Sequence, residues 1–353
     1  MSEDFKLDSH KLMFHPCEVA RWLHGEEIYP IEIEISPSGT CNHRCTFCAV
    51  DYLGYKPVFL NSHMMFNNIE HMKKHGLKSV ICSGEGEPLL NKDMPNLVVN
   101  MKRIGLDVAM ASNGVLLNKE ITEECLHAFT WVRFSVAAIY EETYKKIHNS
   151  KNGDLQRTLN NIAYAVEWKK KRNLKTTLGV QCLLIKENIN EILDMAKELK
   201  KLKVDYFTVK PYSQHMQSKN RLEVDYKELF ELENSIKQYE SEEFKIYYRI
   251  NAMKKMKENK RYDNCYGLPF MTHIDARGNV WPCVNFIGKF EFLYGNLYEQ
   301  SFEKIWHGEK RKKVMSSFEE MDINHICRDA CRLDEINQYL YQLKHPGTHV
   351  NFI

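Results

Sequence analysis

Short runs rich in β-branched residues alternate with longer amphipathic stretches from about residue 30 to residue 210. The amphipathic stretches repeat their apolar residues at a period near 3.6, which is typical of helices that cover a sheet. This alternation predicts repeated βα units and a parallel sheet. Six strands are expected, at residues 31–35, 79–82, 107–110, 132–136, 177–183 and 206–210. The expected helices span residues 68–75, 94–104, 120–128, 155–172 and 189–202.

Six βα units are fewer than the eight that close a TIM barrel, so we expect an α/β fold with a partial, TIM-like (β/α)6 barrel. Its site should lie at the carboxyl ends of the strands. After residue 210 the sequence becomes polar and charged, with a helix expected at 226–239 and a strand at 244–250. Further on, residues 272–275 and 279–281 flank a turn and predict a hairpin.

The length of 353 residues has room for this barrel and a second, smaller domain. We expect three parts, which are an N-terminal extension at 1–29, the barrel at 30–240, and a small α+β domain at 241–353.

The charge of the chain is nearly balanced, with 49 basic and 47 acidic residues. A net charge of +2 gives no reason to expect a nucleic acid or a membrane surface as partner. The N-terminus is acidic and has no apolar signal segment, and no apolar run has membrane-spanning length. We therefore expect a cytoplasmic protein. In that compartment, eleven cysteines indicate thiolate ligation rather than disulfides.

Three cysteines lie close together directly after the first predicted strand, in residues 41–48 with the sequence CNHRCTFC. Cys41, Cys45 and Cys48 can hold three irons of one [4Fe–4S] cluster and leave the fourth iron without a protein ligand. An open iron can bind a cofactor or substrate. Taken alone, the spacing also suits a zinc site or three buried thiols.

This motif, with the aromatic Phe47 before its third cysteine, resembles that of the radical SAM superfamily. A second segment, residues 83–88 with the sequence SGEGEP, resembles the family's Gly-Gly-Glu-Pro motif, with Glu85 replacing the first glycine. The resemblance implies that the open iron binds the amino and carboxylate groups of S-adenosylmethionine. It also implies that Phe47 lies beside the adenine and that Gly86 and Glu87 form the site for the methionine ammonium.

Two weaker likenesses to the same family follow along the chain. Asn113 lies in the segment ASNG after the third strand, which is similar to a Thr-Asn-Gly motif of the family. Ser135 ends the fourth strand, where relatives place a group that contacts the cofactor ribose. Either residue could instead be a helix cap or a turn residue.

The last quarter of the chain holds four more cysteines. The spacing of Cys265, Gly278 and Cys283 resembles the opening of the SPASM and twitch domains of radical SAM enzymes, and Cys327 and Cys331 complete the set. Four cysteines imply one auxiliary [4Fe–4S] cluster, whereas a full SPASM domain has seven and binds two. With four ligands the cluster would conduct electrons or anchor the fold. Structural zinc is the alternative.

The four remaining cysteines are expected to be small buried hydrophobic residues. They are Cys17, Cys82, Cys125 and Cys182. Some radical SAM epimerases quench the substrate radical with a cysteine thiol, which makes Cys182, on a strand, and Cys82, at a strand end, catalytic candidates.

The resemblance implies reductive cleavage of S-adenosylmethionine, with an electron from a flavodoxin or ferredoxin, and hydrogen abstraction from a substrate. About thirty residues precede the first strand, too few for the winged module of many peptide-maturing relatives. We therefore expect carbohydrate-type modification of a small polar substrate, such as a sugar, nucleotide sugar or cyclitol, by oxidation, epimerisation or rearrangement. The alternatives are a radical SAM (RiPP) peptide maturase and a non-catalytic iron–sulfur or zinc scaffold.

Overall fold

The computed structural model describes residues 9–256 and 258–352, and its strands form a ten-stranded sheet in the order β10-β9-β8-β1-β2-β3-β4-β5-β6-β7. The strands from β1 to β8 all pair in parallel, and the hairpin strands β9 and β10 continue the sheet in antiparallel pairing. The strand bounds are β1 Glu32–Ile35, β2 Ser79–Cys82, β3 Asp107–Ser112, β4 Trp131–Ser135, β5 Thr177–Leu184, β6 Tyr206–Pro211, β7 Lys245–Tyr248, β8 Met271–Ile274, β9 Asn279–Trp281 and β10 Gly295–Asn296.

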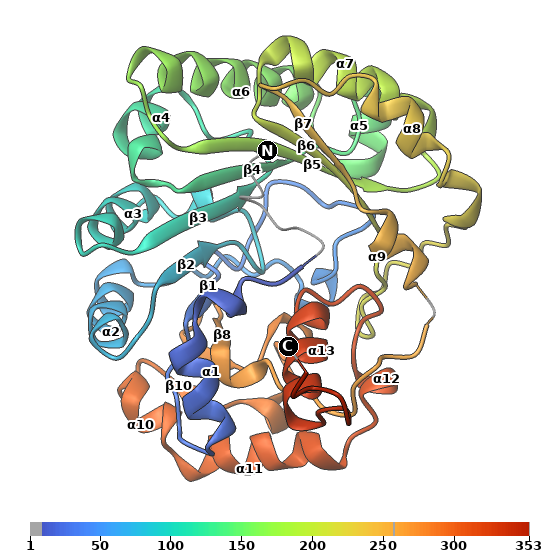
Figure 1. Cartoon of the computed structure of the whole chain (residues 1–353). Coiled ribbons are helices and arrows are strands. Elements are labelled where there is room, and N and C mark those ends of the chain that lie inside the picture. Colours follow the sequence, from blue (N-terminus) through green and yellow to red (C-terminus); the bar gives the residue numbers. More distant parts are fainter. Residues whose placement is uncertain (1–8, 257, 353) are drawn as a thin grey trace.

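Helices α2 to α8 lie along the outer side of this sheet, and α10 to α13 form the lower part of the molecule in Figure 1. The longer helices have the expected places. Their bounds are α1 Pro16–Leu23, α2 Ser62–Lys74, α3 Met94–Arg103, α4 Lys119–Cys125, α5 Glu141–His148, α6 Asp154–Lys171, α7 Ile192–Leu202, α8 Leu232–Lys237, α9 Ile250–Lys254, α10 Phe302–Trp306, α11 Glu309–Ser317, α12 Ile323–Ile326 and α13 Asp334–Lys344.

The predicted fold class, a partial TIM-like α/β barrel followed by a smaller C-terminal unit, is confirmed. The six predicted barrel strands occur as β1 to β6, with ends that shift by one or two residues. Two further strands join the same sheet, because β7 pairs with β6 and β8 pairs with β1. The sheet therefore continues beyond the boundary placed at residue 240, and the division into three parts stays a prediction.

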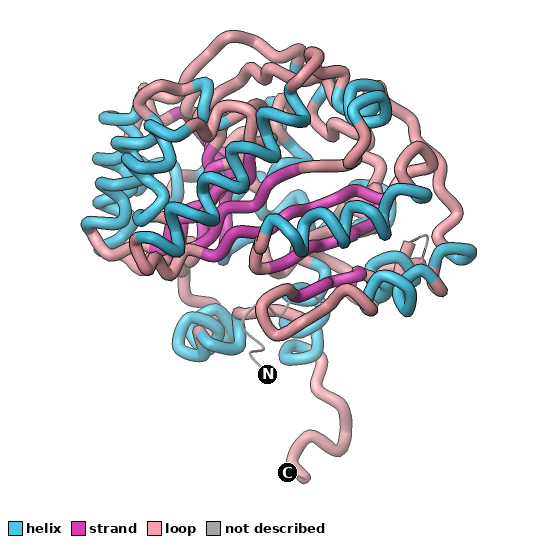
Figure 2. The backbone as a smooth tube through the Cα atoms, turned by 90° about the horizontal axis from the view of Figure 1, so that it is seen from above, coloured by secondary structure: helices cyan, strands magenta, loops and turns pink. Residues whose placement is uncertain are grey.

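The two faces of the sheet differ in chemistry. Val132 and Phe134 of β4 are fully buried on the outer, helix-covered face, and a Cβ added to Gly114 would come within 2.9 Å of both Phe134 and Thr158 of α6. Arg133 and Ser135 alternate with them and therefore point to the inner face. Figure 2 shows this curved sheet with helices packed along its outer side.

The predicted N-terminal extension is described only from residue 9 onward, and residues 1–8 lie outside the described part. Helix α1 packs against the C-terminal part of the chain, in a small core of Leu12, Val19, Ile28, Ile31, Phe270 and Leu340. Within residues 9–256 and 258–352, no helix has both the length and the apolar composition needed to cross a membrane.

Candidate active site

Cys41, Cys45 and Cys48 lie in the long loop between β1 and α2. Burial raises the pKa of Cys45 well above its ordinary value, and the neighbouring thiols of Cys41 and Cys48 raise it further. Within the loop, the amide of Cys48 donates to the carbonyl of Cys45 at 3.0 Å. Two backbone bonds hold the loop against the end of α5, from Arg44 N to the carbonyl of His148 at 3.0 Å and from Thr46 N to the carbonyl of Ile147 at 2.8 Å.

The SGEGEP segment after β2 packs against the cysteine loop. The amide of Glu87 donates to the carbonyl of Thr40 at 2.9 Å. At Gly86, an added Cβ would lie 1.9 Å from the same carbonyl oxygen, so only glycine fits. The sequence suggested that this glycine admits a ligand, whereas the close neighbour in the structure is the cysteine loop itself.

Glu87 is almost fully buried, and each of its carboxylate oxygens accepts hydrogen bonds. Oε1 accepts from Ser112 Oγ at 2.7 Å and from Leu89 N at 3.2 Å, and Oε2 accepts from Asn113 N at 2.8 Å. Burial raises the pKa of Glu87, and these bonds oppose the rise. They fix the orientation of the carboxylate, and because Oε1 already accepts two bonds, only Oε2 keeps a lone pair for a further donor.

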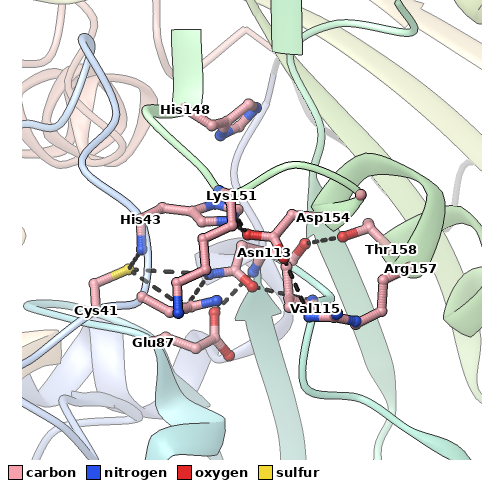
Figure 3. A network of polar contacts seen from close by, with 12 residues as sticks. Cys41, His43, Glu87, Asn113, Val115, His148, Lys151, Asp154, Arg157 and Thr158 are labelled. Carbon is pink, nitrogen blue, oxygen red and sulfur yellow. Dashed lines mark hydrogen bonds and ion pairs between the residues drawn. The ribbon is translucent and has the colours of Figure 1, made fainter. Parts of the chain in front are cut away.

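Asn113 connects the end of β3 with the cysteine motif (Figure 3). Its side-chain Nδ2 donates to Asn42 Oδ1 at 2.7 Å and lies 3.9 Å from Cys41 Sγ, while its Oδ1 accepts from Val115 N. Asn113 therefore acts as a turn residue and also lies next to the cysteine motif.

Phe47 and Ser135 complete the set of predicted cofactor contacts. Phe47 is half-buried, with its ring edge-on to His148 at 5.4 Å. Ser135 is half-buried on the inner face at the end of β4, next to the β3 end that leads into Asn113. The structure thus places Gly86, Glu87, Asn113 and Ser135 at the carboxyl ends of β2, β3 and β4, and Phe47 in the loop after β1, where its ring contacts His148.

His148 is a site residue that no sequence motif indicated. Its Nε2 accepts a hydrogen bond from Ala137 N at 3.1 Å, so the ring proton must sit on Nδ1 in the neutral imidazole. Nδ1 lies 3.2 Å from Cys45 Sγ. Burial, with the nearby His43, lowers the pKa of His148 to about 3, which keeps the ring neutral. His148 therefore directs an N–H donor at Cys45.

His43, inside the cysteine motif, lies beside His148, with the two ring centroids 5.5 Å apart. It is 1% exposed, and its Nε2 lies 3.2 Å from Asp154 Oδ2. Asp154 in turn accepts from Lys151 N and pairs with Arg157 (Figure 3). Asp154 begins α6, so this network ties the motif to a helix more than a hundred residues away.

The loop after β6 covers the cysteine motif. Ser218 Oγ and Asn220 Nδ2 each donate to the carbonyl of Cys48 at 3.2 Å. Near its start, the same loop contacts the C-terminal cysteine segment, because Arg328 Nη2 donates to the carbonyl of Ser213 at 2.6 Å. The sequence showed this loop only as part of a polar, charged stretch. Contacts between residues far apart in the chain leave no local sequence pattern.

The four C-terminal cysteines also come together. Burial raises the pKa of Cys265 and Cys283, and the nearby Cys331 thiol raises both further. A hydrogen bond between Cys327 and Cys331 raises the pKa of the former and lowers that of the latter. Additional donors reach these sulfur atoms, namely Leu333 N at 3.4 Å, Asn337 Nδ2 at 3.5 Å and Asn285 Nδ2 at 3.7 Å.

The remaining cysteines lie away from both sets. Cys82, Cys125 and Cys182 are fully buried, as expected. Cys182 is on the outer face of β5, where its sulfur contacts the carbonyl of Ala137 and Asn188, so neither Cys182 nor Cys82 is brought to the inner face. The expectation that Cys17 is buried is wrong, because it lies on the exposed side of the short helix α1 while Val19 faces the core.

Two protein-family models match this chain. The model of the radical SAM superfamily matches residues 35–209, and the model of the SPASM iron–sulfur cluster-binding domain matches residues 265–332. The chain belongs to the radical SAM superfamily. It carries a radical SAM domain followed by a SPASM domain, and these domains imply a [4Fe–4S] cluster, S-adenosylmethionine and auxiliary iron–sulfur as cofactors.

Relatives of this radical SAM enzyme act in different reactions. It is 29% identical over 174 residues to a probable GTP 3′,8-cyclase of Methanocaldococcus jannaschii, a match that covers 48% of this chain and 55% of the cyclase. The chain thus matches about half the length of that relative. It is 26% identical to the AdoMet-dependent heme synthase of Methanosarcina barkeri, over 80% of this chain and 83% of the synthase.

Among solved structures, Streptococcus suis SuiB bound to the precursor peptide SuiA has the same fold. The TM-score is 0.68 at 17% identity, and the match covers 95% of this chain and 78% of SuiB.

Proposed function

We propose that Cys41, Cys45 and Cys48 hold the catalytic [4Fe–4S] cluster of this enzyme and leave one iron open for S-adenosylmethionine. When bound, these two groups supply a reductive cleavage whose radical product takes a hydrogen atom from the substrate. The observation that carries the proposal is that one loop holds all three cysteines and is hydrogen-bonded, through Thr40, to Glu87, whose buried carboxylate is held in one orientation.

The donor set of the first site fits such a cluster. Thiolates are the usual protein ligands of iron–sulfur clusters, and their negative charge is stabilised by nearby N–H donors. The amide of His43 lies 3.4 Å from Cys41 Sγ, and His148 Nδ1 lies 3.2 Å from Cys45 Sγ. Because burial raises the pKa of these thiols, metal binding must release their protons.

S-adenosylmethionine would lie across the carboxyl ends of β1 to β4. There Glu87 would accept from its ammonium group, Phe47 would pack beside the adenine, and Ser135 would contact the ribose. Gly86 and Asn113 would act indirectly, because Gly86 lets the cysteine loop approach and Asn113 holds Asn42.

The four C-terminal cysteines would hold one auxiliary cluster. Cys265, Cys283, Cys327 and Cys331 supply four thiol donors, which leaves no iron of a cubane open. Arg328 donates to the loop that also covers Cys48, so one segment, residues 213–220, links both cysteine sets. When bound, such a cluster would supply electron-transfer chemistry or anchor this part of the fold.

We place the substrate on the inner face of the sheet, between the two cysteine sets. The row of residues that pair across β4, β5 and β6 is Ser135, Gln181 and Thr208, all polar. A polar row supports a small polar substrate, such as a sugar, a nucleotide sugar or a cyclitol. The modification would be an oxidation, an epimerisation or a rearrangement, with a flavodoxin or ferredoxin as electron donor in the cytoplasm.

A peptide substrate is the second candidate. The structure of SuiB bound to the peptide SuiA favours it, because that structure covers 95% of this chain. This likeness concerns the fold. The neighbouring genes distinguish the two substrate classes. A gene for a short precursor peptide would support a peptide substrate, whereas genes for sugar-nucleotide enzymes would support a small polar substrate.

Anaerobic reconstitution tests the proposed function. With dithionite and S-adenosylmethionine, the wild-type enzyme should release 5′-deoxyadenosine, and the Cys45→Ala variant should release none. Cys17→Ala is the matched control, because Cys17 is exposed and remote, and it should behave as wild type. A wild-type protein that binds iron yet releases no 5′-deoxyadenosine would be a scaffold. Deuterium transfer from labelled candidate substrates into 5′-deoxyadenosine then identifies the substrate class.

A further inference from the structure

Two basic side chains project from the inner face of the sheet. Arg133 of β4 pairs with Gly179 of β5, which pairs with Tyr206 of β6, so these three positions share one row. Lys210 lies on the same face of β6, four residues beyond Tyr206. At Gly179 an added Cβ would lie 2.1 Å from the Tyr206 ring, so the ring covers β5 in the row of Arg133.

These two cations differ from Arg332, which also reaches the inner face. Arg332 contacts the carboxylates of Glu32 and Glu34. Among the described residues, neither Arg133 nor Lys210 forms an ion pair with a carboxylate. Arg133 lies over the Trp131 ring at 5.1 Å, and its buried Nε has no hydrogen-bond partner in the described part of the chain.

Both side chains are half-buried, and Glu34, the carboxylate that acts on Arg133, is itself paired with Arg332. A partly desolvated cation without an ion pair of its own is costly, which makes these two unusual. Burial lowers the pKa of Lys210 well below its ordinary value, and the guanidinium of Arg133 lowers it further. Burial lowers the pKa of Arg133 in the same way. An anion at this place would reverse both shifts.

Thr208 supplies a neutral donor beside them. It lies two residues before Lys210 on the same face of β6, is 3% exposed, and its buried hydroxyl lacks a partner among the described residues. Most buried hydroxyl groups in proteins are hydrogen-bonded, so an unpaired one on the inner face indicates a missing ligand.

We infer that Arg133, Thr208 and Lys210 form a subsite for an anionic group of the substrate, a carboxylate or a phosphate. The inference rests on the proposed function, since it places the substrate on the inner face, and it narrows the substrate class to polar molecules that carry an acid group. Fixing that group would hold the reacting carbon in one orientation near the cofactor end of the strands.

The carboxylate of S-adenosylmethionine is the competing occupant. Ser135, the proposed ribose contact, lies on the same face of β4 two residues after Arg133, nearer to the carboxyl end. The subsite therefore lies deeper along β4 than the proposed cofactor position. Titrations on enzyme already saturated with S-adenosylmethionine separate the two occupants.

The test is a calorimetric titration of the reconstituted enzyme, saturated with S-adenosylmethionine, with inorganic phosphate, with acetate and with neutral ribose. We expect the wild type to bind at least one of the anions and the Arg133→Gln and Lys210→Met variants to bind it roughly tenfold more weakly or worse. Phosphate and acetate distinguish the two acid groups. The matched controls are Arg103→Gln and Lys102→Met, two exposed positions of α3, which should bind as wild type.

Three outcomes would overturn the inference. They are no anion binding by the wild type, equal binding by the wild type and both inner-face variants, and variants that lose affinity for S-adenosylmethionine itself. Release of 5′-deoxyadenosine is measured on the same samples. Its absence in the wild type would refute the proposed function, whereas normal release without anion binding would refute only the subsite.

Discussion

Arg332 Nη1 donates a hydrogen bond to Glu34 Oε2 at 2.5 Å, and the same guanidinium contacts Glu32. Arg332 directly follows Cys331, whereas Glu34 lies on the inner face of β1. Burial raises the pKa of Glu34, but Arg332, together with His273 and Ser83, lowers it below its ordinary range. This ion pair fastens the C-terminal cysteine segment to the first barrel strand.

Replacing Arg332 by methionine should therefore destabilise the protein. The variant leaves the Glu34 carboxylate, 7% exposed, without its counter-charge. We expect a loss of about 2 kcal/mol in the free energy of unfolding, less than for a fully buried pair, because the Arg332 side chain is 38% exposed. Urea unfolding at about pH 7 measures this loss of free energy, because the Glu34 carboxyl is then ionised in both the folded and the unfolded chain. Arg103→Met, on exposed α3, is the control, and equal midpoints for both variants would contradict the prediction.

Local patterns in the sequence were sufficient for much of this fold. The period of apolar residues predicted β1 to β6, and the position of the cysteine motif directly after the first strand predicted that Cys41, Cys45 and Cys48 lie in the loop that follows β1. Both features depend on residues that are neighbours in the chain, and such features leave a readable pattern.

Long-range contacts left no such pattern. The strand at β7 and the hairpin strand at β8 were both expected, but nothing local told which barrel strands they would join. The same holds for His148, which reaches Cys45 across 103 residues, and for Asn220, which reaches Cys48 across 172. Pairing of this kind is decided by the packing of the whole barrel.

Gly86→Ala should prevent normal assembly of the first cluster. The new methyl group would lie 1.9 Å from the carbonyl oxygen of Thr40, which is backbone and cannot move aside without displacing the cysteine loop. We expect destabilisation by about 3 kcal/mol or more and a loss of iron per chain. Iron analysis of the reconstituted protein checks this. Gly347→Ala is the control, because an added Cβ there meets nothing within 4 Å. Full iron content in both variants would show that the loop adapts.

His215, in the loop that covers the cysteine motif, should make stability depend on pH. It is 1% exposed, and burial, with the nearby cation of Arg328, lowers its pKa to about 4. Between this value and about 6.5 the unfolded chain binds a proton that the folded chain does not, so stability falls as the pH falls through that window. Urea midpoints at about pH 7 and about pH 5 should differ less in His215→Gln than in wild type. The exposed His127→Gln should keep the wild-type difference, and an unchanged slope in His215→Gln would contradict the assignment.

His148→Phe should lower the reduction potential of the cluster that we assign to Cys41, Cys45 and Cys48. In the wild type, the N–H at Nδ1 points at Cys45 Sγ from 3.2 Å, and a donor to a cluster sulfur favours the more negative, reduced state. Phenylalanine keeps a ring of similar size and removes the donor, so we expect a decrease on the order of 50 mV. An EPR-monitored redox titration measures the shift. His148→Gln retains an N–H donor and should restore part of the potential, while the exposed His127→Phe should leave it unchanged. Identical potentials in wild type and His148→Phe would show that the contact has no effect on the cluster.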